Sequence, residues 1–177
     1  MNRFDNDPVD LALLPKAETI SLQPIELSYK KVLLWSSLIG WGVMGVIAGI
    51  IIYFTPALHS IIWVPVIAAG IICLFLLQIW ITFKSVARSA YAIRERDLVY
   101  QSGWIMQRFS VCPFNRIQHC SVNAGPFERK LNLASLSVYT AGTEGADIKI
   151  PGLAKERAFE LRDFIMKKSG YDDQHGD

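Results

Sequence analysis

Hydrophobic residues fill one long stretch of this chain, and charged residues are absent from it. Between Lys31 and Lys84 the sequence contains no Asp, Glu, Lys or Arg. The polar sequence Thr-Pro-Ala-Leu-His-Ser at residues 55–60 divides the stretch into two apolar segments, residues 32–54 and 61–83. Both have the length of about 20 residues that a helix needs to cross a bilayer. The pattern predicts two transmembrane helices; the alternative, a buried hairpin in a soluble protein, is disfavoured because soluble helices keep a polar face.

The charges that flank the two segments predict their orientation. Lys30 and Lys31 precede the first segment, Lys84 and Arg88 follow the second, and the connector carries neither Lys nor Arg. Because cytoplasmic flanks are enriched in Lys and Arg, we expect both termini in the cytoplasm and the hairpin in the inner (plasma) membrane. No charged residue lies within either segment, which argues against an ion path built by this chain alone.

Glycine is frequent in the first apolar segment. Gly45 and Gly49 have the GxxxG spacing that lets another helix approach closely, so they are candidate helix-packing residues. That other helix belongs either to a further subunit, which includes a second copy in a homo-oligomer, or to the hairpin of the same chain. The sequence leaves both options open.

After residue 84 short alternating segments replace the continuous apolar run. The segments with a strand pattern, separated by turn residues, are 85–94, 98–101, 105–111, 116–124, 135–140 and 147–150. Residues 154–168 have a helical period, with Ala158, Leu161 and Ile165 on one stripe. The predicted fold is therefore a membrane helical hairpin followed by a mostly-β, partly open barrel. A C-terminal α-helix caps the barrel, because an open sheet edge needs a cover.

Length and composition set further limits. With 177 residues the chain has room for one soluble domain beside the hairpin. We predict a cytoplasmic arm at residues 1–31, the hairpin at 32–83, the domain at 84–170 and a polar tail at 171–177. A net charge of +2 is too small to indicate nucleic-acid binding. The three cysteines have the spacing of neither a disulfide framework nor a zinc site.

Several motifs in the predicted domain resemble the bacterial pleckstrin-homology-like (PH-like) proteins of the YdbS type. They are Pro-Phe-Asn-Arg-Ile-Gln at residues 113–118, Gly-Pro-Phe-Glu-Arg at 125–129, Leu-Asn-Leu-Ala at 131–134 and Thr-Ala-Gly at 140–142. The resemblance covers the chain from about residue 29 to residue 170. It implies a bent, seven-stranded barrel capped by a C-terminal helix, preceded by two transmembrane helices. Asn132 stands where the family has glycine, and asparagine tolerates positive φ, so we expect the turn to survive.

The resemblance also points to candidate contact residues. Arg94 and Arg96 lie on the predicted turn between the first two strands, where basic residues of eukaryotic pleckstrin-homology domains hold phosphoinositide headgroups. The alternative is a solvated turn near an anionic leaflet. Arg116 and Arg129 match the family motifs, and either a structural role or contact with a partner fits them.

The sequence contains no pattern typical of catalysis. We find no nucleophile–base pair, paired carboxylates, phosphate loop or metal-ligand spacing, so we expect no enzyme activity, no cofactor and no metal. The leading hypothesis is an interaction or scaffold module in a membrane complex. Its partners would be the lipid bilayer and a larger membrane protein with the same domain type, as the resemblance implies. The alternatives are an anionic-lipid headgroup reader at the inner leaflet and an accessory subunit of a transporter or export system.

Overall fold

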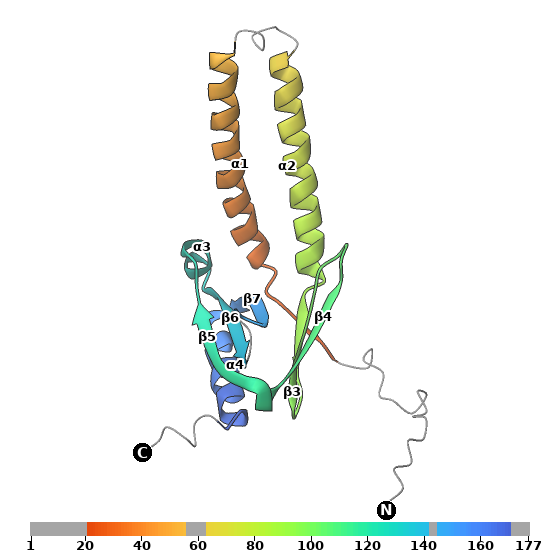
Figure 1. Cartoon of the computed structure of the whole chain (residues 1–177), viewed down its shortest axis with the longest axis vertical. Helices are drawn as coiled ribbons and strands as arrows, with labels where there is room; N and C mark the ends of the chain where they lie inside the picture. Colours follow the sequence, from red (N-terminus) through yellow and green to blue (C-terminus); the bar gives the residue numbers. More distant parts are fainter. Residues whose placement is uncertain (1–20, 56–62, 142–144, 171–177) are drawn as a thin grey trace, which may run out of the picture.

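Two long helices stand on a small β domain (Figure 1). The structure, a computed structural model, describes residues 21–55, 63–141 and 145–170. The helices are α1 (Tyr29–Phe54) and α2 (Trp63–Ala87), and both are long and apolar enough to cross a membrane. They run antiparallel, and the Lys30 ammonium lies 5.8 Å from the centre of the Phe83 ring, which sets the first turn of α1 level with the end of α2. The predicted hairpin is confirmed, and its connector at residues 56–62 lies outside the described residues.

The second helix continues past the end predicted for it. The sequence pattern predicts a strand from residue 85, whereas the structure keeps residues 85–87 helical and begins β2 (Ala90–Ile93) after a short turn. The helix extends because Val86 is buried in the core of the domain, and the Ser89 hydroxyl closes the last turn by donating to the Ser85 carbonyl oxygen at 2.9 Å. The prediction was wrong here, and α2 enters the domain without a linker.

Part of the predicted N-terminal arm belongs to the domain. Strand β1 (Gln23–Pro24) pairs antiparallel with β2, and Ile25 after it is buried in the core. The Glu26 N–H donates to the Gly152 carbonyl oxygen at 2.9 Å. The arm prediction is corrected for these residues, because pairing with β2 satisfies their backbone and burial covers Ile25. Residues 1–20 of the predicted arm and the tail at residues 171–177 lie outside the described part of the chain.

Two antiparallel sheets form the body of the domain. In the first, β1 is followed by β2, β3 (Asp97–Ser102) and β4 (Arg108–Pro113), each pairing with the next. The second contains β5 (Ile117–Asn123), β6 (Leu133–Thr140) and β7 (Ile148–Ala154). The 3₁₀ turn η4 (Phe114–Arg116) links the sheets, and the short helix α3 (Pro126–Lys130) lies between β5 and β6. The described part of the chain therefore contains seven strands, one of them before the hairpin.

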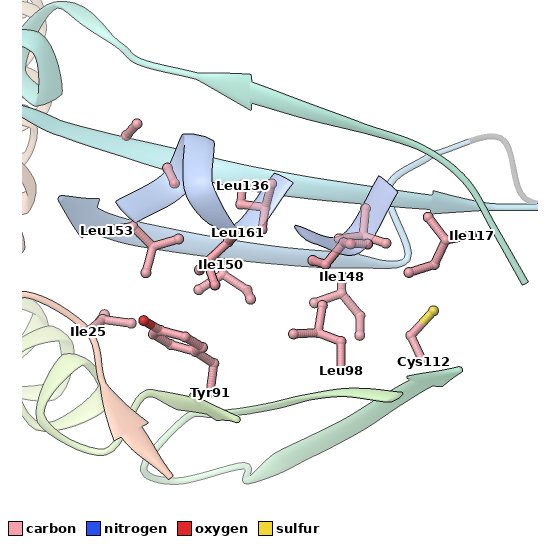
Figure 2. Close-up of a cluster of buried hydrophobic side chains, with 14 of the residues drawn as sticks. Ile25, Tyr91, Leu98, Cys112, Ile117, Leu136, Ile148, Ile150, Leu153 and Leu161 are labelled. Atoms are coloured by element: carbon pink, nitrogen blue, oxygen red, sulfur yellow. The ribbon is translucent and has the colours of Figure 1, made fainter. Parts of the chain in front are cut away.

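Helix α4 (Lys155–Lys168) covers the second sheet, which confirms the predicted C-terminal cap. Its buried stripe is Ala158, Leu161 and Ile165, as the helical period predicts. Figure 2 shows Tyr91 and Leu98 of the first sheet facing Leu136 and Ile150 of the second, with Leu161 beside them. Burying each such large apolar side chain contributes about 1.5–3 kcal/mol, so this layer holds the two sheets together.

The hairpin and the domain share a packed junction. Val32 of α1 and Val86 of α2 are both buried, although most of each helix is exposed for lipid. The Tyr29 side chain, at the start of α1, lies against Gly152 of β7. Val86 lies in the core cluster of the domain, and Tyr29 and Leu33 of α1 pack against that cluster, which fixes how the domain sits beneath the membrane helices.

Candidate functional site

Three of the four candidate arginines gather at the end of the domain that lies away from the helices. The turn at residues 94–96 joins β2 to β3, and the Phe114 N–H donates to the Arg96 carbonyl oxygen at 3.0 Å, which brings η4 and Arg116 beside this turn. Because β2 starts close to the end of α2 and its four residues rise about 3.3 Å each, the turn lies about 13 Å farther from the membrane. Figure 1 shows the link between β4 and β5 at this same end. Arg94 also lies 3.8 Å from the Asp97 carboxylate.

Arg129 lies at the opposite end of the domain. It belongs to α3, which packs beside the first turns of α1 (Figure 1). Glu128 holds α3 in place, because its carboxylate accepts hydrogen bonds from the Gly125 N–H and from the Ser135 hydroxyl, both at 2.8 Å. Arg129 is exposed and belongs to a helix that contacts α1. The four arginines therefore do not form one site: Arg94, Arg96 and Arg116 face the far end, and Arg129 faces the bilayer side.

A groove of about 410 Å³ lies between the first sheet and α4. Ile93, Leu161 and Phe164 provide its apolar surface, and Gln23, Arg157 and Glu160 form much of its polar rim. Phe164 is only partly covered, at 41% exposure, although its ring meets the buried Phe114 edge-on with centroids 6.2 Å apart. The groove thus offers an exposed aromatic side chain on a rigid support.

Arg157 bridges the two sides of this groove. Its guanidinium lies 3.1 Å from the Glu160 carboxylate on the same helix and 3.5 Å from the Gln23 side-chain oxygen on β1. The Tyr91 hydroxyl and the Glu160 carboxylate raise the pKa of Arg157 above its ordinary value, so the cation is permanent. A guanidinium has five N–H donors, and these contacts leave donors for a further acceptor. The groove therefore combines apolar surface with a fixed positive charge, which suits a chain segment with a large apolar residue near a carboxylate.

A second hollow, of about 370 Å³, opens between β3–β4 and β7 on the membrane side of the domain. Its lining includes the hydroxyls of Tyr100, Ser102 and Ser110 and the cations Arg108 and Lys149. Burial raises the pKa of Tyr100, so this phenol stays protonated and can donate a hydrogen bond. The Asp147 carboxylate also lines the hollow, so its charges are mixed and it does not form a purely cationic anion site.

The glycine face of α1 has no contact with the rest of the described chain. A Cβ added at Gly45 or Gly49 meets nothing within 4 Å. The two helices are joined elsewhere, where the Trp41 indole N–H donates to the Gln78 side-chain oxygen. Of the two options that the sequence leaves open, packing within the hairpin does not use these glycines in this structure.

The groove is not apparent from the sequence because its residues come from distant parts of the chain. The pattern predicts only that Tyr91 lies in a strand and Phe164 in the last helix. One signal in the sequence could have indicated it. Phe164 lies at the edge of the apolar stripe of the helix, where a ring is only partly covered, and Arg157 lies two turns before it. Within residues 21–55, 63–141 and 145–170, no group of three or more His, Cys, Asp or Glu is placed to hold a metal ion.

Comparison with known proteins agrees with this architecture. The family model described as "Bacterial PH domain" matches residues 30–169, which include both the hairpin and the domain. The UPF0699 transmembrane protein YdbS of Bacillus subtilis (strain 168) is 35% identical over 77 residues, 44% of this chain and 46% of that protein. The match therefore spans less than half the length of that relative. No solved structure matches the chain. With most of its length matched, the chain belongs to the bacterial PH domain family, as a membrane protein of the YdbS type.

Proposed function

We propose that the protein is a membrane-anchored interaction module, without enzyme activity, that binds a protein partner through the groove between β1–β2 and α4. The observation that carries the proposal is the pairing of the exposed Phe164 ring with the permanent Arg157 cation across one hollow. Aromatic residues, including phenylalanine, and arginine are enriched at the centres of protein interfaces. The partner segment is extended, with an apolar side chain on Phe164 and a carboxylate on Arg157. A membrane protein with the same domain type is the partner that the family resemblance implies.

Site-specific photocrosslinking in native membranes tests this function. A photoreactive phenylalanine analogue replaces Phe164 in the full chain, and mass spectrometry identifies what it captures. Phe159 is the matched control, since it lies on the same helix with a similar exposure of 37% but outside the groove. We expect one protein to be captured from position 164 and not from position 159. Equal capture from both positions, or lipid alone, would contradict the proposal.

Charge variants test the role of Arg157 in the same experiment. Arg157→Glu places a negative charge where the partner's carboxylate binds, so we expect the adduct from position 164 to fall at least about ten-fold, the loss of about 1.4 kcal/mol. Arg162→Glu is the control, because Arg162 lies on α4 outside the groove and pairs with Asp163 at 2.7 Å. An unchanged adduct with Arg157→Glu would restrict the proposal to apolar contacts.

We also propose the inner membrane, with both termini in the cytoplasm. The support is the position of the basic residues: Lys30, Lys31, Lys84 and Arg88 all lie where the helices meet the domain. Lysine and arginine concentrate at cytoplasmic flanks, so the domain is placed on that side. Protection of the domain from added protease in intact cells, followed by cleavage once the inner membrane is opened, is the expected result.

A second candidate function is anionic-lipid reading at the membrane side of the domain. Arg129 and Lys130 of α3 lie beside α1, whereas Arg94 and Arg96 lie at the far end. Native mass spectrometry of the full chain, purified with its bound lipids, separates the two ends. Under this candidate, Arg129→Ala with Lys130→Ala removes bound anionic lipid and Arg94→Ala with Arg96→Ala does not. Equal lipid retention in both double variants would eliminate it.

A further inference from the structure

The turn between β3 and β4 is built to present apolar side chains. Gly103 has a φ of +91°, and a Cβ added there would collide with the Met106 carbonyl oxygen, so this tight turn requires glycine. The residues that follow are Trp104, Ile105 and Met106, which we call the hairpin tip. A surface turn usually carries polar residues, so three consecutive large apolar side chains need a physical reason.

The hairpin tip reaches the level of the membrane-spanning part of α2. The Trp104 ring meets the Trp80 ring edge-on, with centroids 4.9 Å apart and an angle of 80° between the planes. Trp80 precedes Lys84 by one helical turn, which is about 6 Å of rise toward the apolar segment. Figure 1 shows the β3–β4 hairpin rising beside the lower turns of α2. The tip therefore extends past the basic end of the span instead of stopping below it.

The most exposed apolar side chains of the domain all lie at this end. Met106 is 85% exposed, Ile105 is 68% exposed and Leu27 is 63% exposed, whereas the next described residue outside α1 and α2, Val111, is 50% exposed. Leu27 lies two residues before the start of α1, while the hairpin tip lies beside α2. Apolar exposure on two sides of the α1–α2 hairpin, at the membrane end of the domain, fits a continuous apolar medium better than a single protein contact.

Basic side chains accompany these apolar ones. Lys84 lies in the last turn of α2 and Arg88 directly follows that helix. Arg108 begins β4, separated from the tip by one residue, and Lys30 and Lys31 follow Leu27. Apolar side chains flanked by cations are the composition of segments that lie in the boundary between acyl chains and anionic headgroups. Tryptophan pairs such as Trp80 with Trp104 also favour this boundary.

We infer that the hairpin tip inserts into the lipid interface and acts as a third membrane contact of the domain, beside α1 and α2. Ile105 and Met106 enter the acyl boundary, Trp104 lies at the headgroup level against Trp80, and Arg108 contacts lipid phosphates. The occupant of this apolar surface is therefore the bilayer. The contact fixes the rotation of the domain about the long axis of the α1–α2 hairpin. It therefore sets the direction in which the groove beside α4 faces.

Spin labelling of the full chain in lipid nanodiscs tests the inference. Met106→Cys, in a Cys73→Ala background, receives a nitroxide label, and Glu95→Cys on the far turn is the matched control. The native thiols interfere little, because burial raises the pKa of Cys112 and raises the pKa of Cys120 to about 12. Collision rates with oxygen, which concentrates in lipid, and with a water-soluble nickel chelate report the depth of each label. Discs that hold a single chain exclude contact between copies.

We expect the label at position 106 to collide with the nickel chelate at least about five-fold less often than the label at position 95, because the bilayer interior excludes the charged chelate. The label at position 106 should also collide with oxygen more often than the label at position 95. Equal chelate collision rates at the two positions would overturn the inference. Protection that appears only in discs with two chains would also overturn it and assign the tip to a contact between copies. Ile105→Cys gives an independent reading should the label at position 106 disturb the turn.

Discussion

The Tyr29 side chain lies so close to Gly152 that no side chain fits between them. A Cβ added to Gly152 would lie 2.6 Å from Cγ of the Tyr29 ring, and Gly152 has a φ of +66°. Tyr29 starts α1 and Gly152 belongs to β7, so this contact joins the membrane hairpin to the second sheet. Two separate constraints, the left-handed backbone and the ring above it, therefore fall on one glycine.

Gly152→Ala is expected to destabilise the protein by about 2–5 kcal/mol, the sum of a left-handed alanine and an overpacked contact. Gly170→Ala is the control, since Gly170 has a φ of +75° but nothing within 4 Å of its added Cβ. It should cost no more than about 1–2 kcal/mol, the backbone part alone. Chemical unfolding of the full chain in detergent measures both variants. Equal losses would show that the Tyr29 contact contributes nothing.

Asn132 provides a second backbone test. It has a φ of +55°, which confirms that asparagine takes the positive-φ turn where the family has glycine. We expect Asn132→Ala to lose about 1–2 kcal/mol, because alanine tolerates this backbone poorly, and Asn132→Gly to stay close to the native stability. Thermal unfolding of the two variants side by side checks this. An alanine variant as stable as the glycine variant would contradict a backbone origin.

Asn132 also affects the titration of Glu156. The carboxylate accepts a hydrogen bond from its own backbone N–H and hydrogen bonds from the Asn132 amide at 3.1 and 3.2 Å, which together lower the pKa of Glu156. A lowered pKa contributes stability that is present above the unfolded pKa and is lost as pH falls through the folded pKa. In Asn132→Gly the pKa of Glu156 should rise toward its ordinary value but stay below it, since the backbone bond remains. NMR titration measures this, and Asn123→Gly should leave the value unchanged, because the Asn123 amide donates to the Ser121 hydroxyl and not to Glu156.

The membrane hairpin and the final helix were predictable from sequence because their signals are local. A charge-free run longer than a bilayer and a 3.6-residue stripe both exist within one segment. Strand β1 has no such signal, since it is two residues long, includes Pro24 and forms only by pairing with β2 on the other side of the hairpin. The end of α2 was predicted wrongly for a related reason. Burial of Val86 in the domain, a long-range effect, extends the helix beyond the predicted end.

The candidate site was less predictable for the same reason. Arg94 and Arg96 were found on a turn, but their distance from the bilayer depends on the direction in which β2 leaves α2. The groove needs Tyr91 and Phe164 on facing elements, and no spacing in the sequence relates them. The sequence pattern predicts a strand from Ile105, which includes two residues of the hairpin tip, because Ile105, Phe109 and Val111 share one face. In the structure the turn that begins at Gly103 includes the hairpin tip, and β4 begins only at Arg108.

Cys120 is expected to resist alkylation in the folded protein. Burial raises the pKa of this thiol to about 12, whereas an unperturbed cysteine titrates near 8.5, so the reactive thiolate at pH 8 should be at least about a hundred-fold rarer. A raised pKa also means that the stabilising contribution is complete below the unfolded pKa and is lost as pH rises toward 12. Iodoacetamide labelling followed by peptide mass spectrometry gives the rate, with the urea-unfolded chain as the reference. Rates that match between the two states would refute the prediction.

Gly45 and Gly49 allow a test of assembly that leaves the hairpin itself intact. Because a Cβ at either position meets nothing within 4 Å, Gly45→Leu with Gly49→Leu should preserve the Trp41–Gln78 contact and the folding of the chain. Any assembly that uses this face should be lost, since leucine keeps a second helix from close approach. Val43→Leu with Val46→Leu is the control on the same helix, where both positions already carry bulky exposed side chains. Crosslinking in native membranes measures assembly, and full assembly in the glycine variant would show that this face contacts only lipid.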